Sequence, residues 1–384
     1  MSQTDTVSAT PPPSSKWWQW LGVLALIYLL ICAVGLIGTG FEEATGGRAK
    51  ELFSFATNPY VGLVIGIVAT ALIQSSSTVT SLIVGMVAGG LPVAIAVPMV
   101  MGSNIGTTVT NTLVSLGHMR KKNEFRRAFA AATVHDFFNL LAVVIFLPLE
   151  IMFGLLEKSS AYVAHLLVGG SSLSMSGVNI VSSLTSPVVN AIEASVRLVP
   201  NSTASGVVLV LVGLALIFFS ITYVGKLLRV LMVGKAKEVM HRAIGKGPFT
   251  GICSGTLITV FVQSSSTTTS LMVPLAGAGT FTLKQIYPFM LGANIGTTIT
   301  ALLAATAVSG PMEVPAMQIA LVHVLYNFFS VALIYSLPFL RELPLRGADK
   351  LSRLASKKKW YAAVWIFGVF LLLPLLLIAL TTLF

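Results

Sequence analysis

The sequence QSSST stands at residues 74–78 and again at residues 263–267, each time inside an otherwise apolar stretch. Each copy is followed, in the same order, by an Asn-Ile-Gly motif and a His-x-x-x-Asn motif: GSNIGTT and VHDFFN after the first copy, GANIGTT and VHVLYN after the second (102–108, 134–139, 292–298 and 322–327). The three pairs are offset by 188 to 190 positions, which composition alone does not explain. The chain therefore contains an internal duplication, and the fold prediction starts from it.

The composition is that of a membrane protein. Of the 384 residues, 55% are hydrophobic and only 10% are charged, whereas soluble domains average about 25% charged residues. Apolar runs near the roughly 20 residues needed to cross a bilayer lie at 17–38, 129–149, 207–224, 320–340 and 361–384. Because a chain in a bilayer must satisfy its backbone hydrogen bonds internally, we predict an all-α polytopic transmembrane protein. We find no phosphate-binding G-x-x-x-x-G-K motif, no zinc motif and no convincing Ser/His/Asp set, so we predict that it is not an enzyme.

The charged residues predict the topology. Of the 24 Lys and Arg, five lie in 118–127, six in 226–247 and seven in 341–359, which places these three segments in the cytoplasm. The 150–200 connector holds only two and is predicted to be extracytoplasmic. The equivalent spans of the two halves then run in opposite directions, as in transporters built from inverted repeats. The excess of basic residues in the cytoplasmic segments also explains the net charge of +11, so the charge does not indicate nucleic-acid binding.

Each half is predicted to contain a re-entrant helical hairpin and a discontinuous helix. The hairpins span 52–89 and 249–279 with QSSST at their turns, and the helices span 92–117 and 283–308 with breaks at the Asn-Ile-Gly motifs, where glycine permits an unwound backbone. The predicted division of the chain is a disordered cytoplasmic tail (1–15), repeat 1 (16–149), the connector (150–200), repeat 2 (201–340), and a basic cytoplasmic loop with an extra C-terminal helix (341–384).

The two QSSST turns and the two Asn-Ile-Gly breaks are expected to meet in one central site. These four motifs offer hydroxyl, amide and backbone groups but no charged side chain. Hydroxyl and carbonyl oxygens suit a hard cation such as sodium, and backbone N–H groups at helix N-termini suit an oxyanion. A divalent anion alone would be strongly desolvated at the midplane of the bilayer, which favours binding of anion and cation together.

The duplicated QSSST, the paired GSNIGTT and GANIGTT and the stretch EFRRAFAAATVHDFFN (124–139) resemble the type II sodium–phosphate cotransporter family, over about 52–340 of the chain. The resemblance implies sodium-driven uptake of inorganic phosphate by alternating access. It implies sodium as co-substrate and only metal ion, and no cofactor.

The resemblance also assigns site residues. It implies that phosphate is bound by Ser75, Ser76, Asn104, Ser264, Ser265 and Asn294. It implies that sodium is bound by Gln74, Ser77, Thr78, Thr107, Gln263, Ser266, Thr267 and Thr297. Each His-x-x-x-Asn motif places two polar groups on one helix face, where they are expected to support the neighbouring break (His135, Asn139, His323 and Asn327). Asp136 is expected to pair with Arg126 or Arg127.

Several alternatives remain open from the residues alone. Serine and threonine runs also serve close helix packing, and the Asn-Ile-Gly motifs also suit simple kinks. Another oxyanion, such as sulfate or arsenate, would suit the same groups, and a non-transporting scaffold or receptor would share the ancestry. The expected setting is a plasma membrane, the inner membrane of a bacterial cell, with the N-terminus in the cytoplasm. Both a monomer and a homodimer remain possible.

Overall fold

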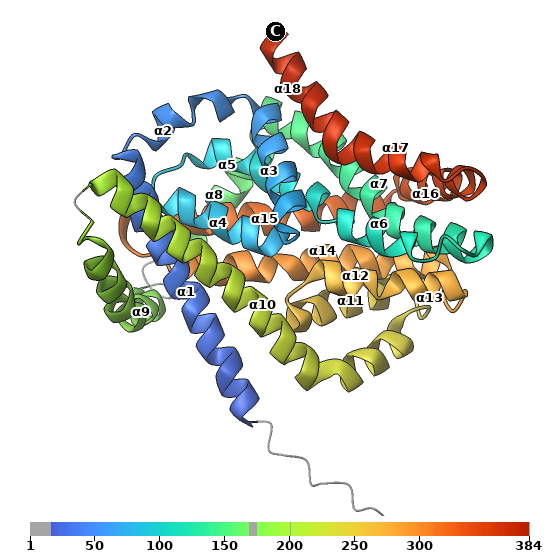
Figure 1. Cartoon of the computed structure of the whole chain (residues 1–384), viewed down its shortest axis with the longest axis horizontal. Helices are drawn as coiled ribbons and strands as arrows, with labels where there is room; N and C mark the ends of the chain where they lie inside the picture. The colour runs from blue at the N-terminus through green and yellow to red at the C-terminus, as the bar shows by residue number, and fades with distance from the viewer. Residues whose placement is uncertain (1–16, 169–174, 200, 384) are drawn as a thin grey trace, which may run out of the picture.

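A computed structural model describes residues 17–168, 175–199 and 201–383 (Figure 1). The predicted tail, 1–15, lies outside this part of the chain. Within it every regular element is a helix, and seven segments are long and apolar enough to cross a membrane: Trp17–Thr45, Val93–Leu116, Lys122–Phe153, Ser202–Leu228, Leu283–Ala305, Gly310–Ser336 and Trp360–Ala379. The predicted all-α polytopic membrane fold is confirmed.

The first half of the chain begins with a long helix and continues with shorter ones. The elements are α1 (Trp17–Thr45), α2 (Ala49–Leu52), a 3-10 turn (Ser54–Thr57), α3 (Pro59–Ile73), α4 (Ser76–Ala88), α5 (Val93–Gly106), α6 (Val109–Leu116) and α7 (Lys122–Phe153). The predicted connector holds two further helices, α8 (Leu155–Val168) and α9 (Met175–Val196).

The second half also begins with a long helix and continues with shorter ones. It consists of α10 (Ser202–Ala243), α11 (Pro248–Val262), α12 (Ser265–Ser270), α13 (Met272–Ala278), α14 (Leu283–Ala305), a 3-10 turn (Gly310–Met312) and α15 (Glu313–Ser336). The chain ends with α16 (Pro338–Lys357), α17 (Trp360–Phe367), a π-helical turn (Gly368–Leu372) and α18 (Leu373–Leu383). Helices α1 and α10 lie side by side across one flank, and α14 and α15 run through the middle (Figure 1).

The two halves share one mode of helix packing, in which glycines allow two backbones to touch. A Cβ atom on Gly102 of α5 would lie 2.0 Å from the carbonyl oxygen of Leu63 in α3. In the second half, a Cβ atom on Gly292 of α14 would lie 2.0 Å from the carbonyl oxygen of Ile252 in α11. Only glycine fits at such a distance, so these residues determine how closely each pair of helices packs.

The predicted break at 292–298 is wrong, because α14 is a continuous helix from Leu283 to Ala305. In the first half the predicted break shrinks to Thr107 and Thr108, which separate α5 from α6 and keep right-handed helical backbone angles. The glycines of both motifs lie close to a neighbouring helix. They therefore allow close helix packing and do not mark an unwound backbone.

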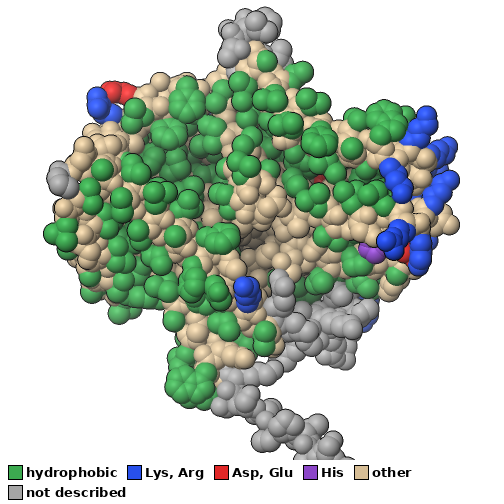
Figure 2. All heavy atoms as spheres, in the orientation of Figure 1, with side chains coloured by type: hydrophobic (Ala, Val, Ile, Leu, Met, Phe, Trp, Pro, Cys, Tyr) green, Lys and Arg blue, Asp and Glu red, His purple; other side chains and the backbone are tan. Residues whose placement is uncertain are grey.

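The predicted basic cytoplasmic loop is also wrong in its structure, since most of 341–359 is the amphipathic helix α16. One face of α16 is buried against α7, and its basic residues lie on the other face. Lysine and arginine side chains gather at the end of the molecule formed by α16 and the start of α7 (Figure 2). Inverted orientation and re-entrant course remain predictions.

Candidate ion-binding site

The first QSSST segment forms a sharp turn between α3 and α4. Gln74 ends α3 in the left-handed region with φ of 59°, and its backbone N–H donates to the carbonyl of Thr70 at 2.8 Å. Ser75 then caps α4, because its Oγ accepts a hydrogen bond from the backbone N–H of Thr78 at 3.2 Å. Serine is among the preferred N-cap residues, which explains why α4 begins at this point in the sequence.

The second QSSST segment has the same local structure. Gln263 ends α11 with φ of 54°, and the Oγ of Ser264 accepts from the backbone N–H of Thr267 at 3.2 Å. Of the described residues, Gln74 and Gln263 are the only ones other than glycine with positive φ. Residues with a Cβ rarely adopt this conformation, so its recurrence shows that the two turns share an unusual backbone structure.

A threonine from the neighbouring helix fixes each glutamine. The Oγ1 of Thr110 donates to the Oε1 of Gln74 at 2.7 Å, and the Oγ1 of Thr300 donates to the Oε1 of Gln263 at 2.9 Å. The Nε2 of each glutamine donates back to its own helix, at the carbonyls of Ala71 and Val260 respectively. Neither threonine was predicted from the sequence, although they occupy equivalent places in GTTVT and GTTIT.

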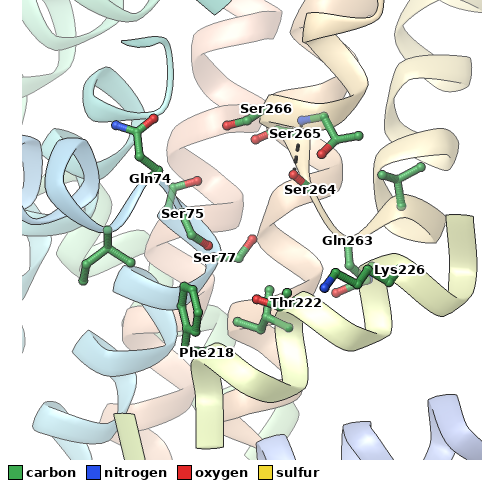
Figure 3. Close-up of a pocket in the computed structure, with 16 residues that line it drawn as sticks. Gln74, Ser75, Ser77, Phe218, Thr222, Lys226, Gln263, Ser264, Ser265 and Ser266 are labelled. Atoms are coloured by element: carbon green, nitrogen blue, oxygen red, sulfur yellow. Dashed lines mark hydrogen bonds between the residues drawn. The ribbon is translucent and has the colours of Figure 1, made fainter. Parts of the chain in front are cut away.

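Both turns open onto one pocket of about 340 Å³ (Figure 3). The lining residues come from the first turn (Ile73, Gln74, Ser75, Ser76 and Ser77), the second turn (Val262, Gln263, Ser264, Ser265, Ser266 and Thr267) and α10 (Phe218, Ile221, Thr222, Gly225 and Lys226). The structure therefore brings together most of the predicted ion ligands from positions 189 residues apart in the chain.

The serines of the pocket differ in their bonding. The hydroxyls of Ser76, Ser77 and Ser265 form no hydrogen bond to any described residue, whereas Ser75 and Ser264 are engaged as caps. The three unbonded hydroxyls are the groups with the most capacity to bind a solute.

Five predicted ligands do not line the pocket: Thr78, Asn104, Thr107, Asn294 and Thr297. The Oγ1 of Thr78 donates to the Oγ of Ser75 at 2.9 Å and so reinforces the cap. Thr107 and Thr297 donate to the carbonyls of Ser103 and Ala293 one helical turn earlier, at 3.0 and 2.9 Å.

The two asparagines join the halves of the protein instead. The Nδ2 of Asn104 donates to the Oδ1 of Asn327 at 2.8 Å, and its Oδ1 lies 3.2 Å from the Nε2 of His323. All three side chains are buried, although they come from α5 and α15.

Asn294 makes the equivalent contacts in the other direction. Its Oδ1 lies 2.6 Å from the Nε2 of His135, and its Nδ2 donates to the Oδ1 of Asn139 at 2.8 Å. The supporting residues thus contact the Asn-Ile-Gly motifs, but each His-x-x-x-Asn pair holds the asparagine of the opposite half. Both asparagine amides are already hydrogen-bonded within the protein.

Asp136 does not pair with arginine, contrary to expectation. Its Oδ2 accepts a hydrogen bond from the Nε1 of Trp365 in α17 at 2.7 Å and one from the Oγ1 of Thr112 at 3.4 Å. Arg126 pairs with Asp349 at 3.4 Å, and Arg127 donates to the carbonyl of Gly277. At a rise of about 1.5 Å per residue, the arginines lie roughly 14 Å along α7 from Asp136 and cannot reach it.

The pocket has no acidic lining, and among its lining residues only Lys226 carries a charge. In the described part of the chain no group of three His, Cys, Asp or Glu is placed to hold a metal ion. Solutes would therefore meet hydroxyl, amide and backbone groups, together with one ammonium group.

These features define a polytopic helical membrane protein with an internal polar pocket between two equivalent turns. The chain matches the model of a family described as Na+/Pi-cotransporter over residues 29–176 and 216–337, and it belongs to that family.

Named relatives agree with this membership. Sodium-dependent phosphate transport protein 2A of Rattus norvegicus is 34% identical over 422 aligned residues, which cover 92% of this chain and 66% of the relative. Sodium-dependent phosphate transport protein 2B of Homo sapiens is 32% identical over 440, which cover 92% of this chain and 64% of the relative. The chain thus spans slightly less than two thirds of the length of these relatives. No solved structure matches it.

Proposed function

We propose that the protein couples the influx of sodium to the uptake of inorganic phosphate. Membership of the Na+/Pi-cotransporter family supports this, as do its similar relatives, which are sodium-dependent phosphate transport proteins. The single observation that carries the proposal is the convergence of both QSSST turns on one pocket whose serine hydroxyls are available for ions.

Phosphate would be bound by Ser75, Ser76, Ser264 and Ser265. Their hydroxyls lie beside the first backbone N–H groups of α4 and α12, which have no partner inside the helix. The positive end of the α4 dipole favours a bound anion at this place.

Sodium would be bound by the remaining oxygens of the turns, from Gln74, Ser77, Gln263, Ser266 and Thr267. Each glutamine is already oriented by a threonine, so its carbonyl oxygen is held in place for a cation. Bound sodium would neutralise phosphate and reduce the cost of carrying it away from water.

Asn104 and Asn294 would act as links between the halves rather than as ligands, because their amide groups are already bonded across the pseudo-symmetric centre. The network joins α5 to α15 and α14 to α7, so a movement of one half would be transmitted to the other. Alternating access in a plasma membrane, with inverted repeats and a cytoplasmic N-terminus, is the transport mode that we propose.

The test is uptake of radiolabelled phosphate into proteoliposomes, with the sodium gradient and the membrane potential set independently. We expect uptake with an inward sodium gradient and none with potassium in its place. Stronger inhibition by sulfate or arsenate than by unlabelled phosphate would point to a different oxyanion. Absence of both sodium-dependent uptake and sodium-dependent phosphate binding, in protein shown to be folded, would contradict transport and favour a scaffold.

A further inference from the structure

One face of α10 forms the wall of the pocket that faces both QSSST turns. Phe218, Thr222 and Lys226 are spaced four residues apart and therefore line one face of the helix. Figure 3 shows all three side chains directed toward the turns, with Lys226 beside Gln263. The equivalent helix of the first half, α1, contributes no residue to the lining, so the pocket is asymmetric.

Lys226 forms no ion pair with a described residue. Its Nζ lies 4.6 Å from the centre of the Tyr223 ring, a contact that leaves the positive charge uncompensated. Some other basic residues are paired, such as Arg353 with Asp349 at 2.6 Å and Lys121 with Glu124 at 2.8 Å, but these lie outside the pocket. The pocket therefore has one unneutralised cation and no carboxylate in its lining.

A single cation at the wall of a partly enclosed pocket has a predictable effect. Low-dielectric walls focus its field into the pocket, which raises the local concentration of anions and their rate of entry. The attraction scales with the charge of the anion, so a doubly charged anion gains more than a singly charged one. Hydroxyl and amide groups alone would provide little of this long-range attraction.

We propose that Lys226 is the anion-recruiting residue of this pocket, which draws phosphate to the QSSST turns. This inference rests on the proposed function. Lys226 needs no direct bond to the bound ion for this role. Because α10 belongs to the second half and α1 does not line the pocket, only the second half provides this charge.

The test compares Lys226→Gln and Lys226→Arg with the wild type and with Lys246→Gln. Lys246 is exposed, as Lys226 is, but lies outside the pocket, so its substitution removes the same charge without changing the pocket lining. In Lys226→Gln we expect the half-saturating phosphate concentration to rise roughly tenfold, with the maximal rate changed by less than about twofold. Lys226→Arg should restore the wild-type value, and Lys246→Gln should leave it unchanged.

Two further readouts separate recruitment from a structural role. Raising ionic strength should weaken phosphate binding in the wild type and have less effect in Lys226→Gln, because salt screens the attraction. The preference for phosphate at pH 8 over pH 6 should also shrink in this variant, since doubly charged phosphate predominates at the higher pH.

An unchanged half-saturating concentration in Lys226→Gln would overturn the inference, as would equal losses in Lys226→Gln and Lys226→Arg. If Lys226→Gln does not transport, sodium-dependent phosphate binding to the purified variant decides, and wild-type affinity there would equally overturn it. Failure of the proposed function would appear in the wild type itself, as absence of sodium-dependent phosphate uptake, and is thus distinguishable.

Discussion

Individual serines of the QSSST turns have separate roles, although the sequence presents them as one run. Ser264 holds the start of α12 through its hydrogen bond from the N–H of Thr267, while the hydroxyl of Ser265 has no partner among the described residues. Equivalent roles fall to Ser75 and Ser76 in the first turn. Substitution of neighbouring serines should therefore affect different properties.

Ser265→Ala should lower sodium-dependent phosphate uptake about tenfold, the equivalent of one hydrogen bond to a charged group, and change the unfolding free energy by less than about 0.5 kcal/mol. Ser264→Ala should lower the unfolding free energy by about 1 kcal/mol, because it removes a cap. Uptake assays and thermal unfolding of both purified variants provide the comparison. Equal stability losses in the two variants would contradict this division of roles.

Asn104 offers a residue-level test of the connection between the halves. Asn104→Ala leaves buried partners on His323 and Asn327 without their hydrogen bonds, which should lower the unfolding free energy by about 1–3 kcal/mol. A double-mutant cycle with Asn327→Ala should give a coupling energy of about 0.5–3 kcal/mol. The control cycle pairs Asn104→Ala with Ser356→Ala in α16, where the serine hydroxyl donates only to the carbonyl of Arg353 and additivity is expected. An additive result for Asn327 as well would remove the proposed link.

The part of the site that could be predicted from the sequence is the part formed by the duplicated motifs. The paired motifs predicted which turns meet, because equivalent segments related by symmetry converge. Thr110 and Thr300 were not predicted, because threonine is common in this chain and their hydrogen bonds to the glutamines depend on how the helices pack. Lys226 lies in a basic segment that topology already explained, so nothing local distinguished it from the other lysines.

At the scale of single helices, glycine determines the packing of α14 on α11. Gly292→Ala would place a Cβ 2.0 Å from the carbonyl oxygen of Ile252, so the helices must move apart. We expect a loss of about 3 kcal/mol or more in the unfolding free energy, measured by thermal unfolding in detergent.

Gly368→Ala is the matched control, because Gly368 is also helical but a Cβ there would meet nothing within 4 Å. Its unfolding free energy should stay within about 0.5 kcal/mol of the wild type. An unchanged unfolding free energy in Gly292→Ala would contradict the close packing of α14 on α11. The glycine would then be better explained as part of a helix break.

Helix breaks and helix packing use the same residues, which explains the error at 292–298. A glycine between polar residues is compatible both with an unwound backbone and with a close helix contact. Only the position of α11 decides between them, and that position depends on the whole fold. The segment 341–359 was misassigned for a related reason: its charges indicated a side of the membrane, whereas its buried face (Leu345, Ala348 and Ala355) becomes apparent only against α7.

At the scale of the whole molecule, charge and symmetry together predict an orientation in the membrane. The segment 118–127 and helix α16 lie at the same end, where the basic side chains gather. The positive-inside rule places this end in the cytoplasm. The segments that follow α6 and α14 are equivalent in the repeats, so inversion requires them to emerge on opposite sides.

Single cysteines in these two segments test the inversion directly. The chain has only two native cysteines, Cys32 and Cys253, which can be replaced by serine. Arg120 follows α6 and Ser309 follows α14, and both are exposed. In intact cells a membrane-impermeant maleimide should label Ser309→Cys and spare Arg120→Cys, whereas permeabilised cells should show labelling of both. Labelling of both in intact cells, or of neither, would mean that the halves are parallel, because equivalent segments would then lie on one side.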